Sequence, residues 1–315
     1  MRSILCAALL AFQVSSFEFQ LPSFKFQVSG NFQPSTLNFQ LLPWPLPPSH
    51  LVEHQRNASI DWTSHIVYSA SSCELESGDE DHAIVRAYES AREQLIAALH
   101  GINITSTDTA GELLGRRAAA LLELQRLASD PVLLAQSVRY GDAPMASILV
   151  GLDLKSSRIL PLLVEGIGVG ELQAGLPRPT PLPAAASAEW LSSIRHPTGL
   201  IIDARKVPLS PALCPAILAE DGRLVYDVRH AQRLWFMQHG GVTYMSDLDA
   251  AKADNLMGVN PKIVEALSVA RSNGCDIIVS DDDADRLIFL RERLPFFAEC
   301  RLIIVCQPIP NDSRQ

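Results

Sequence analysis

Four aspartates stand within five residues of the sequence, at positions 281, 282, 283 and 285. They follow directly on Ile277 to Val279, an apolar segment that reads as a strand. Asp203 likewise follows an apolar segment, and carboxylate oxygens are the ligands that Mg²⁺ and Ca²⁺ prefer in proteins. One hypothesis is therefore a divalent-cation-dependent hydrolase that uses Asp203 together with the cluster from Asp281 to Asp285.

The same aspartates also have a structural explanation. Ser280 is a residue type that caps helices, and acidic side chains in the first turn interact favourably with the unsatisfied N–H groups there, by about 0.3 to 1 kcal/mol each when exposed. The EF-hand pattern fails, because it lacks both its glycine and its closing glutamate. We therefore favour a helix from Asp281 to Arg293 that the aspartates stabilise. We expect no catalytic residue, no cofactor and no metal site in this chain.

Other patterns that carry chemistry fail on their spacing. The segment from Gly166 to Gly170 lacks the third glycine of a dinucleotide loop, and prolines follow where a helix would have to begin. The histidines form no H-E-x-x-H pair, and no G-x-S-x-G elbow occurs. Cys214 precedes His239 in the sequence, but Pro215 beside the cysteine indicates a turn. The six cysteines contain no C-x-x-C, so we expect buried free thiols.

Length and charge limit the class of protein. The chain has 315 residues, which allows two ordinary domains. Its 47% of hydrophobic residues is typical of a globular protein. A net charge of -9 argues against a nucleic-acid partner, because phosphate backbones require a basic surface.

The amino-terminal sequence differs from the rest. Residues 1–16 have the outline of an export signal, with Arg2, the apolar run Ile4 to Phe12 and small residues before a cleavage after Ser16. Residues 17–58 repeat Phe-Gln and contain many prolines, which predicts a low-complexity, extended tether. Such a repeat also fits a translated DNA repeat upstream of the true start. A cytoplasmic binding module with a mis-assigned amino terminus is therefore an alternative to an exported protein.

Residues 59–165 predict a first α+β domain. Alternation of apolar and polar residues predicts one strand over 60–70, and helical spacing predicts an amphipathic helix that ends at His100-Gly101. Thr107 or Thr109 is suited to cap a second helix. Residues 132–140 and 146–154 then alternate around the Gly141-Asp142 turn, which predicts a hairpin. This order favours helices on one face of an antiparallel sheet.

Residues 189–306 predict a second α+β domain, after a proline and alanine linker over 166–188 and before a tail over 307–315. It begins with the apolar strand Gly199 to Ala204. Hairpins follow over Ile217 to Tyr226 and over Lys262 to Val279, then the capped helix and a strand over Cys300 to Cys306. The predicted fold class is thus α+β, with two small domains whose helices pack on mainly antiparallel sheets.

Both halves resemble known envelope proteins. Four segments of the first half resemble LPP-type envelope lipoproteins and the amino domain of flagellar assembly protein T: Ile60-Asp61-Trp62, the helix with Arg86-Ala87 and Ala91, Gly101-Ile102 and the Val138 region. Five segments of the second half resemble the carboxyl half of such proteins: Pro197 to Arg205, Pro211-Ala212-Leu213, Ile217 to Gly222, Asn260-Pro261 and Ile277 to Asp281. The resemblance covers residues 59–305. It implies an exported, non-enzymatic envelope component, sometimes associated with the outer membrane or the flagellar motor.

The leading functional hypothesis combines these observations. We expect a periplasmic or outer-membrane-associated protein that acts through protein contacts, with peripheral rather than integral membrane association. Cys6 lies too near the start for a lipobox, so a lipid anchor is not implied. The apolar strand Ile201 to Ala204 and the hairpin Ile217 to Tyr226 are the expected edges for pairing with a partner strand, because an unpaired edge presents free N–H and C=O groups.

Overall fold

The computed structural model describes residues 17–21, 24–28, 46–55, 58–75, 79–141, 143–173, 197–270 and 274–309. The chain divides into two compact units, 1–46 and 47–315. In the first unit β1 (Phe17–Leu21) and β2 (Phe24–Val28) pair as an antiparallel hairpin, inside the segment predicted to be an extended tether. The predicted export signal and the proline-rich part of the predicted linker lie outside the described residues.

The second unit contains a five-stranded antiparallel sheet. Its order is β3-β4-β5-β7-β6, and its strands are β3 (Val52–His54), β4 (Ala58–Asp61), β5 (Ile66–Glu74), β7 (Met145–Asp153) and β6 (Val132–Arg139). The predicted β6–β7 hairpin is confirmed. β3 belongs to this sheet, although the sequence placed its residues in the tether.

The single strand predicted over residues 60–70 is wrong. β4 and β5 are two strands that pair with each other, and residues 62–65 form the turn between them. The Asp61 carboxylate accepts hydrogen bonds from the backbone N–H groups of Thr63 (2.9 Å) and Ser64 (3.2 Å), the interaction that lets aspartate initiate a turn. His65 completes the turn in the left-handed region, with φ 61°. Asp61 and His65, which alternation predicted to face solvent, are both buried.

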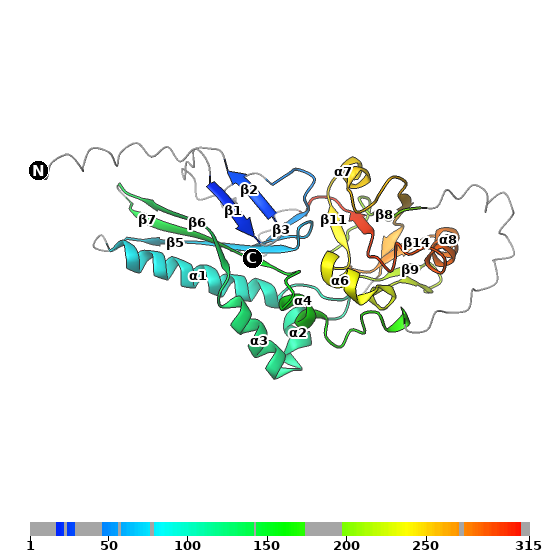
Figure 1. The fold of residues 1–315 in the computed structure, drawn as a ribbon, viewed down its shortest axis with the longest axis horizontal. Helices are drawn as coiled ribbons and strands as arrows, with labels where there is room; N and C mark the ends of the chain where they lie inside the picture. The colour runs from blue at the N-terminus through cyan, green and yellow to red at the C-terminus, as the bar shows by residue number, and fades with distance from the viewer. Residues whose placement is uncertain are drawn as a thin grey trace, which may run out of the picture. The chain divides into compact units, whose positions relative to one another are not determined.

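Helix α1 (Glu80–His100) lies along one face of this sheet (Figure 1). It begins where Asp79 accepts a hydrogen bond from the His82 N–H, and it buries small and apolar residues at helical spacing: Ala83, Ala87, Ala91, Leu95 and Leu99. Thr109, one of the two residues predicted to cap the next helix, caps it in a capping box with Glu112. The predicted second helix is broken into α2 (Ala110–Gly115) and α3 (Ala118–Ala128), and α4 (Ile159–Val164) packs beside them.

The remaining strands form two further sheets. A fully parallel sheet has the order β11-β15-β8-β12, with β11 (Thr243–Met245), β15 (Leu302–Val305), β8 (Leu200–Asp203) and β12 (Lys262–Glu265). A mixed sheet has the order β10-β9-β14-β13, with β10 (Leu224–Tyr226), β9 (Ile217–Ala219), β14 (Ile277–Val279) and β13 (Ser268–Val269).

The sequence predicted some of these pairings and missed others. The hairpin over 217–226 is confirmed. Of the hairpin predicted over 262–279, β13 and β14 pair antiparallel, but β12 leaves to pair with β8 in the parallel sheet. Two helices cover these sheets: α7 (Leu248–Ala253) packs on the parallel sheet, and α8 (Asp281–Arg291) packs on β9 and β10. The other helices of this half are η2 (Glu171–Gln173), η3 (Val228–His230) and α6 (Arg233–His239). The fold class is α+β with mainly antiparallel sheets, as predicted, and the parallel sheet is the departure.

The two halves of the second unit are joined by hydrogen bonds and by a common core. The Ser246 N–H donates to the Ser49 carbonyl at 2.9 Å, and the Cys214 N–H donates to the Ile104 carbonyl at 2.7 Å. The buried rings of Trp62 and Tyr244 meet edge to face, with centroids 5.8 Å apart. One hydrophobic cluster therefore runs from residue 51 to residue 306. None of the helices in the described ranges is long and apolar enough to cross a bilayer.

Candidate functional site

The predicted acidic cluster opens helix α8. The Ser280 hydroxyl accepts a hydrogen bond from the Asp283 N–H at 3.1 Å, so the predicted cap is confirmed. Asp281, Asp282 and Asp283 occupy the first turn, where the partial positive charge of the helix end favours them. Asp283 also lies 3.8 Å from Arg286 and 4.0 Å from Lys262.

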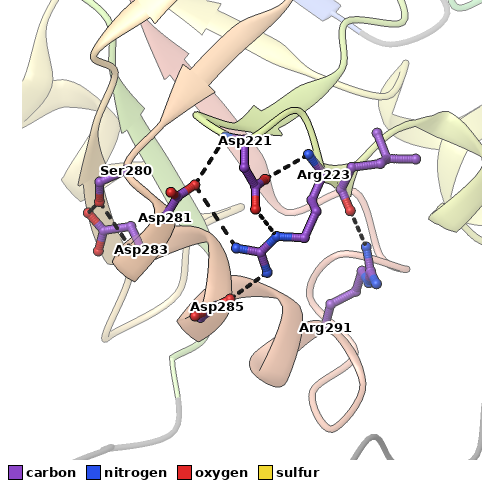
Figure 2. Close-up of polar contacts among 8 residues, drawn as sticks. Asp221, Arg223, Ser280, Asp281, Asp283, Asp285 and Arg291 are labelled. Carbon is purple, nitrogen blue, oxygen red and sulfur yellow. Dashed lines mark hydrogen bonds and ion pairs between the residues drawn. The ribbon is translucent and has the colours of Figure 1, made fainter. Parts of the chain in front are cut away.

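Arg223 pairs with the other carboxylates of this region (Figure 2). Its guanidinium donates to Asp221 at 2.5 Å and to Asp285 at 2.6 Å, and it lies 4.0 Å from Asp281. The Asp221 N–H donates to Asp281 at 3.3 Å. Hydrogen bonds from the Arg223 N–H and side chain lower the pKa of Asp221, and those to Asp285 and Asp221 raise the pKa of Arg223. A cation of the protein itself thus stands where the sequence hypothesis places a metal.

Asp203 does not join this cluster. It ends β8 in the parallel sheet, and the Arg205 guanidinium donates to its two oxygens at 2.8 and 2.7 Å, which lowers its pKa. Within the described ranges, no hydrogen bond or ion pair links Asp203 to residues 281–285. The same part of the chain holds no group of three or more His, Cys, Asp or Glu side chains placed to bind a metal ion. The structure therefore does not bring together the two parts of the proposed cation site.

Titration with Mg²⁺ or Ca²⁺ is expected to give no saturable heat at millimolar concentrations. A divalent ion would have to displace Arg223 from three carboxylates before it could bind them. Isothermal titration calorimetry of the wild type against Asp285→Asn checks this. Saturable binding by the wild type that the Asp285→Asn substitution abolishes would restore the metal hypothesis.

The other sequence candidates have structural explanations. Gly166, Gly168 and Gly170 all have positive φ and form the turn after α4, which the three-residue η2 follows instead of a phosphate-binding helix. Burial raises the pKa of the Cys214 thiol, which disfavours the nucleophilic thiolate. Four of the five described cysteines are buried free thiols, as predicted, and Cys73 is half-buried.

A cavity that the sequence did not indicate lies where the two halves of the second unit meet. Its volume is about 410 Å³, and ten residues line it: Thr63, Lys155, Trp235, His239, Thr243, Met245, Asp254, Asn255, Leu256 and Arg301. They come from the β4–β5 turn, the segment after β7, helix α6, strand β11, the segment after α7 and the residue before β15. No sequence window contains more than a few of them, so no local pattern reports the cavity.

Positive charge dominates this cavity. Lys155 and Arg301 line it together with the imidazole of His239, whereas Asp254 is the acid among the lining residues. Burial lowers the pKa of Lys155, against the attraction of Asp153 and Asp61. Burial also lowers the pKa of His239, and repulsion by Lys155 and Arg301 adds to this effect.

Aromatic rings flank the cationic groups. Trp235 and His239 stack, with centroids 5.4 Å apart and an interplanar angle of 12°. His65 lies behind Lys155, fully buried, and its Nε2 contacts the Val242 carbonyl at 2.9 Å. Burial and the nearby Lys155 lower the pKa of His65 to about 3, so this imidazole is neutral and adds no charge.

A second cavity, of about 380 Å³, contains two histidines. Its lining residues are Pro48, His50, Val52, His54, Ser246, Pro308 and Ile309. His50 Nδ1 lies 2.8 Å from the buried Asp61 carboxylate, an arrangement that orients general bases in enzymes. However, the Ser246 hydroxyl donates to the Pro48 carbonyl at 2.7 Å, and in the described part of the chain it makes no bond to His50. A nucleophile activated by His50 is therefore not assembled.

The comparisons with known proteins concern the second half. Residues 199–308 match a family model described as Treponema pallidum Tp0624, second domain. The match begins at the residue before β8 and extends past β15, so it takes in the parallel and mixed sheets but less than half of the chain. No curated protein matches the chain. Residues 199–308 are thus similar to a domain that occurs elsewhere in a chain with more than one domain.

Proposed function

We propose that the protein is a non-enzymatic, exported component of the cell envelope that binds other proteins through the free edge of strand β6. The observation that supports this proposal is the state of that edge. β6 pairs with β7 on one side, and no strand within the described ranges pairs with its other side. Exposed apolar side chains lie along it: Val132 (43% exposed), Leu133 (44%) and, just beyond its end, Tyr140 (69%). An eight-residue edge of this kind is a template for an added strand.

The two edges expected from the sequence are not free. β8, which contains Ile201, lies between β15 and β12 in the parallel sheet. β10, the outer strand of the other expected edge, has its Leu224 and Val225 carbonyls occupied by hydrogen bonds from Arg291 of α8. Covering an edge in this way prevents further pairing. The contact surface is therefore proposed at β6 in their place.

The proposal of export depends on the sequence of residues 1–16 and on the resemblance to envelope proteins. Mass spectrometry of the native protein tests it. A product that begins at Phe17 supports export, whereas one that begins after residue 50 favours the cytoplasmic alternative.

Strand addition at β6 has a direct test in the producing cells. A photoreactive amino acid at Tyr140 is expected to form a crosslink of defined mass, and Leu133→Lys is expected to weaken that crosslink at least several-fold. An edge lysine opposes pairing because its charge must stay solvated. Val85→Lys is the control, since Val85 is 52% exposed and belongs to helix α1 rather than to β6. Equal crosslinking in the otherwise unchanged protein, in Leu133→Lys and in Val85→Lys would overturn the assignment to β6. So would the absence of any crosslink from position 140 in the folded protein.

A further inference from the structure

Lys155 lines the cavity between the two halves, and Asp153 and Asp61 attract it without a direct ion pair. The Lys155 ammonium makes no hydrogen bond and no ion pair with any residue that the structure describes, although burial already lowers its pKa. Placing a charge in a partly dehydrated site without a direct hydrogen-bond or ion-pair partner is costly. A counter-charge inside the cavity would remove this cost.

Neither of the other two charged residues that line the cavity pairs with Lys155. Arg301 donates from Nε to Glu299 at 2.9 Å and lines the same cavity as Lys155. Asp254, the acid of the lining, accepts a hydrogen bond from the Leu256 N–H at 2.8 Å and ends helix α7. Its carboxylate is thus engaged by its own backbone rather than by Lys155.

The end of helix α6 lies against the Lys155 side chain. Helix α6 ends at Gly240, whose φ of 81° belongs to the left-handed region that favours glycine. A Cβ at this position would lie 3.1 Å from Lys155 Cγ and 3.1 Å from His65 Nε2. The lysine stem and the buried imidazole therefore both lie against the end of α6, beside the cavity that Lys155 lines.

We propose that this cavity binds a small aromatic oxyanion, with its carboxylate or phosphate group between Lys155 and Arg301 and its ring against Trp235. Lysine and arginine are the side chains that proteins use for such groups. A volume of about 410 Å³ exceeds what an inorganic anion fills, and Trp235, Met245 and Leu256 supply apolar surface for the rest of the ligand. The inference does not depend on strand β6, so either proposal can fail alone.

Calorimetric titration of the full chain with phenyl phosphate, benzoate and inorganic phosphate at low ionic strength tests the cavity. We expect phenyl phosphate or benzoate to bind more tightly than inorganic phosphate. Lys155→Gln and Arg301→Gln should each weaken binding of the aromatic anion at least tenfold. Trp235→Leu should abolish the preference for the aromatic anion, because it removes the stacking surface.

Lys206→Gln is the matched control. Lys206 is an exposed lysine that pairs with Glu265 at 2.5 Å and does not line the cavity. Its substitution should leave binding unchanged. If Arg301→Gln does not fold, Lys155→Gln carries the test, because the Lys155 ammonium has no bond to lose. No saturable binding of either aromatic anion at millimolar concentrations, or equal weakening by Lys206→Gln, would overturn the proposal.

Discussion

Replacing Trp62 by alanine is expected to lower the free energy of unfolding by about 3 to 5 kcal/mol. Trp62 is 1% exposed and packs edge-on against Tyr244 across the junction of the two halves. Its indole N–H donates to Glu53 at 2.9 Å, so the substitution removes both packing and a hydrogen bond. Urea denaturation followed by circular dichroism measures the loss.

The shape of the same transition is a second readout. Because one hydrophobic cluster spans both halves, the second unit should unfold in a single transition, in the wild type and in Trp62→Ala. Trp235→Leu serves as a control for loss of an indole. Because Trp235 is only partly buried, this substitution should lower the free energy of unfolding much less than Trp62→Ala does. Two separate transitions in the wild type, or a loss below about 1 kcal/mol in Trp62→Ala, would contradict a common core.

Asp61→Ala is expected to have an effect of similar size at neutral pH, about 3 to 5 kcal/mol, because it removes the acceptor of several buried donors. Asp61 is fully buried, and its carboxylate accepts from His50 Nδ1 (2.8 Å), the Ser64 hydroxyl (2.6 Å) and the N–H groups of Thr63 and Ser64. The substitution leaves these donors without a partner. The exposed Asp249→Ala is the control and should leave stability unchanged.

The pH dependence of that effect has a definite sign. Burial alone would raise the pKa of Asp61, but the hydrogen bonds and the charge of His50, with the bonds from Ser64, outweigh burial and lower it. The unfolded state then binds the proton more readily than the folded state. The contribution of Asp61 is therefore complete above the ordinary carboxyl pKa and is lost as pH falls through the lower pKa of the folded state. The difference between wild type and Asp61→Ala should shrink in acid; a constant difference down to strongly acidic pH would contradict this assignment.

Local interactions made much of the fold predictable. The cap at Ser280, the helix cap expected at Thr107 or Thr109 and the hairpin β6–β7 each depend on residues close in sequence, and each is confirmed. The break between β4 and β5 was missed because the Asp61 turn keeps the alternation of apolar and polar residues, so the pattern of one strand continues through it.

Contacts between distant segments were not predictable. β8 pairs in parallel with β12 and β15, which lie about 60 and 100 residues further along the chain, and no local pattern marks such partners. The cavity of Lys155 and Arg301 was missed for the same reason, since these two residues and Trp235 belong to three separate segments. The acidic cluster is visible in the sequence because its aspartates are adjacent. Arg223, which pairs with them, lies far from them in the sequence.

The cavity that contains His50 has a topological consequence. Pro48, where the chain enters the second unit, and Pro308 and Ile309, at the end of its described part, line the same cavity. Neighbouring points of entrance and departure are what allow a domain to be inserted into a host loop or circularly permuted. Residues 47–309 thus have the geometry of a unit that can be inserted into a surface turn of an unrelated protein without separating the two ends of that turn.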